Sequence, residues 1–246
     1  MGIDLSVMDK MMPKAVQHFW RARRAASKSQ KSRGVTDQGN RSGVTAGKNL
    51  DGFVKMVRDI IAANGVKKSD IYTTGRRDLT IPGFYRPTKN WDLLVVTQSQ
   101  LVAAIEFKSQ VGPSFGNNFN NRVEEALGNA TDIATAFREG AFGESGRPFL
   151  GYFFVLEECD ASTKPVEFTS QHFPVLPEFI ETSYAARYEL LCRKLTQEQL
   201  YDAAAVIYTN QEDAKTGTYR TASDLTSPHR FAASLAGKIA SISGDR

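Results

Sequence analysis

The stretch from Trp91 to Gln110, WDLLVVTQSQLVAAIEFKSQ, contains two apolar runs separated by three polar residues. The runs are Trp91–Thr97 and Leu101–Lys108, and the separator is Gln98-Ser99-Gln100. Short apolar runs rich in Val, Ile and Phe and bounded by turn residues are typical of buried β-strands. The stretch therefore predicts an antiparallel β-hairpin inside the fold.

This hairpin brings three charged side chains to one end of the sheet. If Ser99 is the centre of a three-residue turn, Asp92 lies opposite Glu106. Directly opposed residues share a sheet face, and Lys108, two residues beyond Glu106, points to that face as well. Two close carboxylates repel each other unless a proton, a lysine or a cation lies between them. The hairpin therefore predicts a cation-binding cluster.

Asp92 and Glu106 are candidate ligands of Mg²⁺, and Lys108 is a candidate catalytic residue. Mg²⁺ prefers oxygen ligands and accepts one or two protein carboxylates together with waters and phosphate oxygens. A lysine beside such a metal can orient or deprotonate an attacking water, as a phosphodiesterase requires. The alternative is an ordinary lysine–carboxylate cluster at a strand end, because Asp, thirteen residues and then Glu-x-Lys is a pattern that recurs by chance.

The residues after Lys108 are dense in groups that read DNA bases. Asn and Gln can pair bidentately with adenine, and Arg can pair with guanine. We predict a loop over residues 111–121, because this segment is rich in Gly, Asn and Phe; the alternative is an Asn/Gly turn in which Asn121 caps a following helix. The candidate DNA-binding residues are Ser109, Gln110, Asn117, Asn118, Asn120, Asn121 and Arg122.

Charge is distributed unevenly along the 246 residues. The net charge is +4, yet residues 1–48 hold ten Lys/Arg against three acids, so the remaining 198 residues are slightly acidic. An excess of cations indicates a polyanionic partner, and phosphate contacts are expected from Arg21, Arg23 and Arg24. Further candidates precede Asp92 and are Arg76 and Arg77, together with Arg86 and Lys89.

The remaining patterns predict one α/β domain, over residues 1–246, with helices on a mixed sheet. No apolar run approaches the ~20 residues of a membrane helix, and two cysteines fit a reducing compartment. We expect a basic N-terminal region, 1–48, made of a helix over 5–26 and a mobile arm over 27–48. The other expected elements are helices over 49–64, 121–138, 177–195 and 197–208 (203–208 alternatively a strand), a strand over 148–156, and a last helix from Ser227-Pro228.

The hairpin and the segment after it resemble the XhoI-type restriction endonucleases. The similarity lies in Trp91–Val96, Ala104–Gly112 and Phe119–Arg122, is most specific over 91–138, and spans most of the chain. This family belongs to the nucleases whose active site is written PD-(D/E)xK. Here Trp91 stands where that formula has proline.

The resemblance implies a restriction-endonuclease-like core in which Asp92 and Glu106 bind Mg²⁺ and Lys108 acts on the water. It further implies a restriction–modification enzyme that cleaves duplex DNA at the palindrome 5′-CTCGAG-3′, after the first C of each strand. The products would carry 5′ overhangs with 5′-phosphate and 3′-hydroxyl ends. A homodimer in the bacterial cytoplasm, with no membrane and no further protein partner, is expected.

Three other functions stay open from the residues alone. The first is a structure-specific or repair nuclease built on the same core, which would ignore DNA sequence. The second is a non-catalytic DNA-binding protein whose carboxylates form a salt-bridge cluster. The third is a structural domain that binds polyanions.

Overall fold

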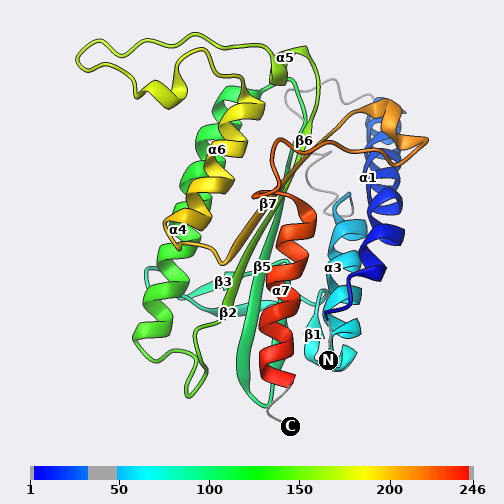
Figure 1. Cartoon of the computed structure of the whole chain (residues 1–246), viewed down its shortest axis with the longest axis vertical. Coiled ribbons are helices and arrows are strands. Elements are labelled where there is room, and N and C mark those ends of the chain that lie inside the picture. Colours follow the sequence, from blue (N-terminus) through cyan, green and yellow to red (C-terminus); the bar gives the residue numbers. More distant parts are fainter. Residues whose placement is uncertain (1–2, 33–48, 244–246) are drawn as a thin grey trace.

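The computed structural model describes residues 3–32 and 49–243 and has an α/β fold around a mixed five-stranded sheet (Figure 1). The strand order is β1-β4-β5-β6-β7; the β1–β4 and β4–β5 pairs are antiparallel, whereas the β5–β6 and β6–β7 pairs are parallel. The strands are β1 (Ile71–Tyr72), β4 (Leu93–Thr97), β5 (Gln100–Gln110), β6 (Phe149–Glu157) and β7 (Ala203–Thr209). The predicted fold class is therefore confirmed.

Helices cover both faces of this sheet (Figure 1). One face packs on α1 (Ser6–Ser32), α3 (Asp51–Ala63) and α7 (Pro228–Ser243) through a buried apolar cluster that includes Phe19, Phe53 and Phe231. The other face packs on α4 (Phe115–Arg138) and α6 (Tyr184–Gln197). Because β6 is buried on both faces, its sequence is an uninterrupted apolar run instead of an alternating one.

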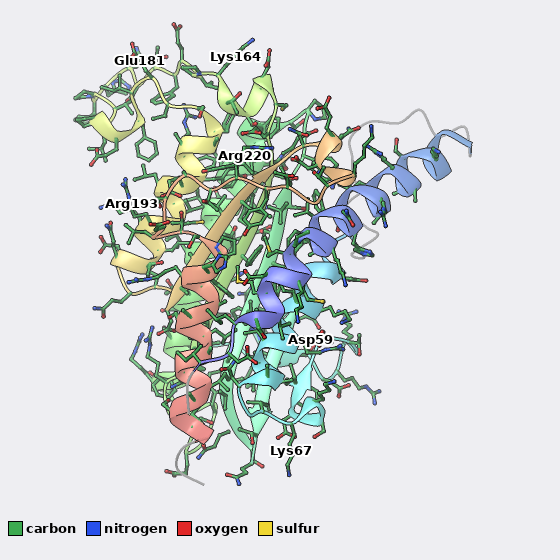
Figure 2. All side chains as sticks on the ribbon, turned by 45° about the vertical axis from the view of Figure 1, so that its right-hand side comes forward. Asp59, Lys67, Lys164, Glu181, Arg193 and Arg220 are labelled. Atoms are coloured by element: carbon green, nitrogen blue, oxygen red, sulfur yellow. The ribbon has the colours of Figure 1, made fainter. Side chains whose placement is uncertain are left out.

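Two smaller features complete the described fold. A two-stranded sheet, β2 (Thr80–Pro82) and β3 (Thr88–Asn90), lies beside the main sheet. The connection between α5 (Asp160–Thr163) and α6 projects away from the sheet, as Lys164 and Glu181 show in Figure 2. Short 3₁₀ turns occur at η1 (Lys68–Asp70), η2 (Pro177–Phe179) and η3 (Gln211–Ala214). Within the described ranges, no helix is long and apolar enough to cross a membrane.

The largest correction concerns the segment predicted as a loop over 111–121. Helix α4 begins at Phe115, so most of that segment is helical, and Asn121 lies inside the helix instead of capping it. Asn and Gly are weak helix formers, but tertiary packing overrides propensity. Phe115 and Phe119 lie one turn apart; Phe115 stacks on Tyr184 of α6, and Phe119 packs edge to face with Tyr188 of the same helix. These contacts stabilise the first turns.

Other boundaries also differ from the predictions. The first helix continues to Ser32, so residues 27–32 of the predicted arm are helical, and residues 33–48 lie outside the described residues. The helix expected over 177–195 is the turn η2 followed by α6. The alternative for 203–208 is confirmed, because β7 forms there and is buried throughout; the helix over 197–208 was wrong. An apolar run of this length does not distinguish a buried strand from a helix.

Candidate active site

The β4–β5 hairpin sets the register of the proposed catalytic residues. Its turn contains two residues, Gln98 and Ser99, both with positive φ, so the three-residue turn predicted from the sequence was wrong. A β-bulge between Val95 and Val96 compensates, because it inserts one extra residue on β5. Leu93 therefore pairs with Ile105, and the next position places Asp92 opposite Glu106 as predicted.

Asp92 lies immediately before β4 and is fixed by the backbone of β5. Its Oδ2 accepts a hydrogen bond of 2.7 Å from the Phe107 N–H. Burial raises the pKa of Asp92, and the negative charge of Glu106 raises it further, to about 6. The two carboxylates therefore repel each other, as the sequence predicted.

Glu106 is buried between two lysines. It is only 4% exposed, and its Oε1 lies 2.6 Å from Lys108 Nζ while its Oε2 lies 2.6 Å from Lys89 Nζ. Burial disfavours the charged carboxylate, but the two lysines outweigh it and lower the pKa of Glu106. Burial likewise disfavours the charged form of Lys108, but the attraction of Glu106 outweighs burial and raises the pKa of the Lys108 ammonium. Glu106 is thus a carboxylate anion and Lys108 is an ammonium cation.

Helix α4 closes the cluster from the side. Glu125 Oε2 lies 3.5 Å from Lys108 Nζ and also binds Arg122, one turn earlier in the helix. The Nε of Arg122 is buried and has no hydrogen-bond partner. Lys108 and Arg122 therefore lie close together around one carboxylate, that of Glu125.

The chemistry of the donor set fits a hard divalent cation. Mg²⁺ accepts one or two protein carboxylates and completes its shell with water and phosphate oxygens, and Asp92 and Glu106 supply that number. A cation would also relieve the repulsion that raises the pKa of Asp92. No third His, Cys, Asp or Glu joins them in a metal-binding group within residues 3–32 and 49–243. Lys89 already neutralises Glu106, so its ammonium and a metal would compete for one carboxylate.

This electrostatic arrangement predicts a pH dependence of the metal-free protein. Folded Asp92 keeps its proton up to pH about 6, whereas the unfolded carboxyl releases it near 3.8. Between these values the folded state binds more protons, so the Asp92 contribution to stability falls as the pH rises from about 4 to about 6. The full effect is up to about 3 kcal/mol.

The measurement is the free energy of urea unfolding in EDTA at several pH values, for the parent and for Asp92→Asn. Asparagine keeps an acceptor for the Phe107 N–H but does not titrate. The difference between the two proteins isolates Asp92 from the other carboxyl groups. We expect that difference to favour Asp92→Asn increasingly between pH 4 and 6; identical pH profiles would contradict a raised pKa of Asp92 in the folded protein.

The structure places the candidate base-reading residues on two elements. Ser109 and Gln110 end β5, and the buried Gln110 side chain donates to the Val111 and Ser114 carbonyls, which holds the turn before α4. Asn118 donates to the Ser114 carbonyl. Three side chains at the start of α4 are exposed, namely Asn117, Asn120 and Asn121, and Arg122 contacts Glu125.

The candidate phosphate contacts are spread over the molecule. Arg76 and Arg77 are exposed in the turn before β2. Arg21, Arg23 and Arg24 lie on α1, which covers the sheet face opposite Glu106 and Lys108. Their contacts differ: Arg21 is exposed, Arg23 lies over the Phe19 ring, and Arg24 donates to the Gln211 carbonyl.

Sequence reasoning missed the roles of three residues. Lys89 and Arg86 were expected among phosphate contacts, but Lys89 pairs with Glu106 and Arg86 pairs with Asp132 on α4. Glu125 on α4, although 44% of its side chain is exposed, also reaches Lys108. One local signal could have indicated the position of Lys89, because it precedes Trp91 by two residues. In the structure its ammonium lies 4.3 Å from the centre of the Trp91 ring. The other two contacts join segments far apart in the sequence.

A mixed sheet flanked by helices on both faces is consistent with the class of nucleases that have a restriction-endonuclease-like core, and Asp92, Glu106 and Lys108 lie together at the β4–β5 hairpin. The model of the family described as Restriction endonuclease XhoI matches residues 29–221, and the chain belongs to this family. It is accordingly a type II restriction enzyme, a site-specific deoxyribonuclease that acts on double-stranded DNA.

Several curated relatives support this membership. The chain is 49% identical over 195 residues to the type II restriction enzyme XhoI of Xanthomonas vasicola, which covers 79% of this chain and 78% of that protein. It is 48% identical to the type II restriction enzyme BstVI of Geobacillus stearothermophilus, covering 77% and 86%. It is 50% identical over 173 residues to AbrI of Azospirillum brasilense, covering 70% and 77%. No solved structure matches.

Proposed function

We propose that this enzyme cleaves duplex DNA at the palindrome 5′-CTCGAG-3′ in the presence of Mg²⁺. The cut would follow the first C of each strand and leave 5′ overhangs with 5′-phosphate and 3′-hydroxyl ends. The enzyme would act as a homodimer, which places one active site on each strand of a palindrome. The whole chain would form one nuclease domain. The cluster of Asp92, Glu106 and Lys108 carries the catalytic part of this proposal, and the family carries the DNA site.

Each catalytic residue has a distinct part in the proposed mechanism. Asp92 and Glu106 would hold the metal, which when bound polarises the phosphodiester and neutralises charge that develops during in-line displacement. Lys108, a cation directed by Glu106 Oε1, would orient the water and donate to the phosphate oxygens. The Phe107 N–H fixes Asp92, so both carboxylates are positioned by the same strand.

DNA binding would involve the surface around this cluster. Asn117, Asn120 and Asn121 are exposed at the start of α4, which makes them the most accessible base-reading candidates. Ser109, Gln110, Asn118 and Arg122 would support that region. Exposed Arg76 and Arg77 would contact phosphates near the catalytic cluster, and Arg21, Arg23 and Arg24 would contact them farther away.

The test is digestion of a plasmid that contains one CTCGAG site. We expect a single linear product in Mg²⁺, no product in EDTA, and end sequences that show 5′ overhangs after the first C. The matched control is a plasmid with one base pair of the site changed, which should be cut at least about 5- to 150-fold more slowly, because one wrong base pair costs about 1–3 kcal/mol of binding free energy.

Two results would contradict the proposal in different ways. Scattered nicks, or cleavage that does not depend on CTCGAG, would favour a structure-specific nuclease on the same core. Specific binding without cleavage in any divalent metal would favour a DNA-binding protein that has lost catalysis.

A further inference from the structure

The loop between β2 and β3, residues Gly83–Pro87, presents two large rings to solvent; we call it the aromatic loop. Phe84 is 50% exposed and Tyr85 is 70% exposed. Their rings pack edge to face with centroids 5.1 Å apart, so they form one patch. Single exposed apolar residues are common, but a paired aromatic patch indicates a binding surface.

A buried carboxylate holds this loop in place. Asp132 of α4 is 4% exposed, and its Oδ1 accepts 2.8 Å hydrogen bonds from the N–H groups of both Phe84 and Tyr85. Its Oδ2 accepts from Arg86 Nε at 2.7 Å. A Cβ on Gly83 would lie 2.5 Å from that Oδ2, so the approach of the chain to Asp132 requires glycine. The rings are therefore presented by a fixed main chain.

The aromatic loop is connected to the active site through two elements. The strand that follows it carries Lys89, which pairs with Glu106. Helix α4 carries Glu125 beside Lys108 and Asp132 beneath the loop. Those two α4 positions are seven residues apart, which is two helical turns or about 10 Å along the axis. The rings thus lie a few base pairs away from a phosphate held at Lys108.

The charge of this region fits a polyanion. Residues 76–90 contain Arg76, Arg77, Arg86 and Lys89 against the single acid Asp78. Two of these cations hold internal ion pairs, while Arg76 and Arg77 are exposed. Aromatic rings flanked by free cations are typical of surfaces that stack on bases and contact phosphates.

We propose that the aromatic loop is a DNA-contacting element, in which Phe84 and Tyr85 pack against bases a few base pairs away from the scissile phosphate. The proposal rests on the proposed function, because it needs duplex DNA at the catalytic cluster. Rigid apolar side chains can insert between base steps. The free-energy cost of unstacking those bases is recovered through additional contacts between protein and DNA. Fixing the loop in advance lowers the conformational entropy lost on binding.

The test compares binding of duplexes by the Phe84→Ala/Tyr85→Ala variant and its parent, both in a non-cleaving Lys108→Met background. Fluorescence anisotropy gives affinity, and 2-aminopurine placed in turn at each position within a few base pairs of the scissile step reports unstacking. We expect the double variant to bind about 10- to 100-fold more weakly and to lose the 2-aminopurine signal. Tyr85→Phe, which keeps the ring, should retain both.

The matched control is Phe173→Ala. Phe173 is 77% exposed and lies on the projecting connection before α6 (Figure 1), so its removal should leave binding unchanged. Thermal unfolding checks the fold of every variant. Only small changes are expected, because the replaced rings are exposed and the Asp132 bonds go to backbone groups.

Three results would overturn the proposal. The first is unchanged affinity and unchanged 2-aminopurine fluorescence in the double variant. The second is that the double variant sediments as a monomer where the parent is a dimer, while its 2-aminopurine signal is unchanged. The aromatic loop would then contact a second copy of this chain instead of DNA. The third is absence of duplex binding by the parent. A different result would separate the two proposals. If the parent bound CTCGAG and altered duplexes equally well, the proposed DNA site would be rejected. If the double variant then bound both duplexes more weakly than the parent, the role of the aromatic loop in DNA binding would still be supported.

Discussion

Replacement of Lys108 by methionine is expected to lower the rate of DNA cleavage about 10³-fold while binding of duplex DNA changes only a few-fold. Methionine fills a similar volume but has no charge and no donor. Lys108 Nζ lies 2.6 Å from Glu106 and faces the space where both carboxylates converge. Loss of a positioned donor that stabilises developing charge removes about 10²–10³ in rate, and loss of assistance to the water adds to this.

The measurement is single-turnover cleavage of a CTCGAG duplex, with anisotropy for binding. Lys164→Met is the matched control, because Lys164 makes an exposed ion pair with Asp160 on the projecting connection, away from the sheet (Figure 2). It should cleave like the parent. If Lys108→Met cleaved within ten-fold of the parent, the catalytic cluster would have to lie elsewhere.

Replacement of Glu106 by alanine is expected to destabilise the fold by about 3–5 kcal/mol, in addition to its effect on cleavage. Glu106 neutralises Lys89 and Lys108, and the side chain of Lys89 is nearly as buried as that of Glu106. Removal of the carboxylate leaves two close ammonium groups, of which Lys108 keeps its ion pair with Glu125 at 3.5 Å while Asp92 still attracts both. The fold therefore bears buried positive charge that is only partly compensated.

Urea unfolding at pH 7 measures this effect, and a second substitution identifies its cause. Glu106→Ala/Lys89→Met should recover part of the lost stability, because the unpaired cation is also removed. Asp160→Ala, which breaks the exposed pair with Lys164, is the control and should cost less than about 1 kcal/mol. A loss below about 1 kcal/mol for Glu106→Ala would show that the cluster is well solvated.

Local sequence patterns were sufficient to predict that Asp92, Glu106 and Lys108 lie close together. Apolar runs around Asp92, Glu106 and Lys108 predict two buried strands, and the two-residue period of a strand puts Glu106 and Lys108 on one face. The turn was predicted one residue too long, yet the pairing of Asp92 with Glu106 was correct. The bulge at Val95–Val96 restored the register, and sequence patterns do not identify such a bulge.

Contacts between distant segments could not be predicted in the same way. The first turns of α4 have a composition typical of a loop, and only packing of Phe115 and Phe119 on α6 explains the helix. Arg86 looked like a phosphate contact, but Asp132, 46 residues later, binds it. Such pairs depend on how α4 lies across the β2–β3 sheet, which no local pattern specifies.

The sequence by itself determined the fold class, the central hairpin and the grouping of the three residues proposed to be catalytic, because strand periodicity and hairpin pairing act over a few residues. The tertiary structure decided the electrostatic state of that trio and the surface around it. Lys89 neutralises Glu106, Glu125 approaches Lys108, and Asp132 fixes the aromatic loop. These contacts form only when β3, β5 and α4 pack together, since burial and charge pairing depend on the three-dimensional neighbours of each group.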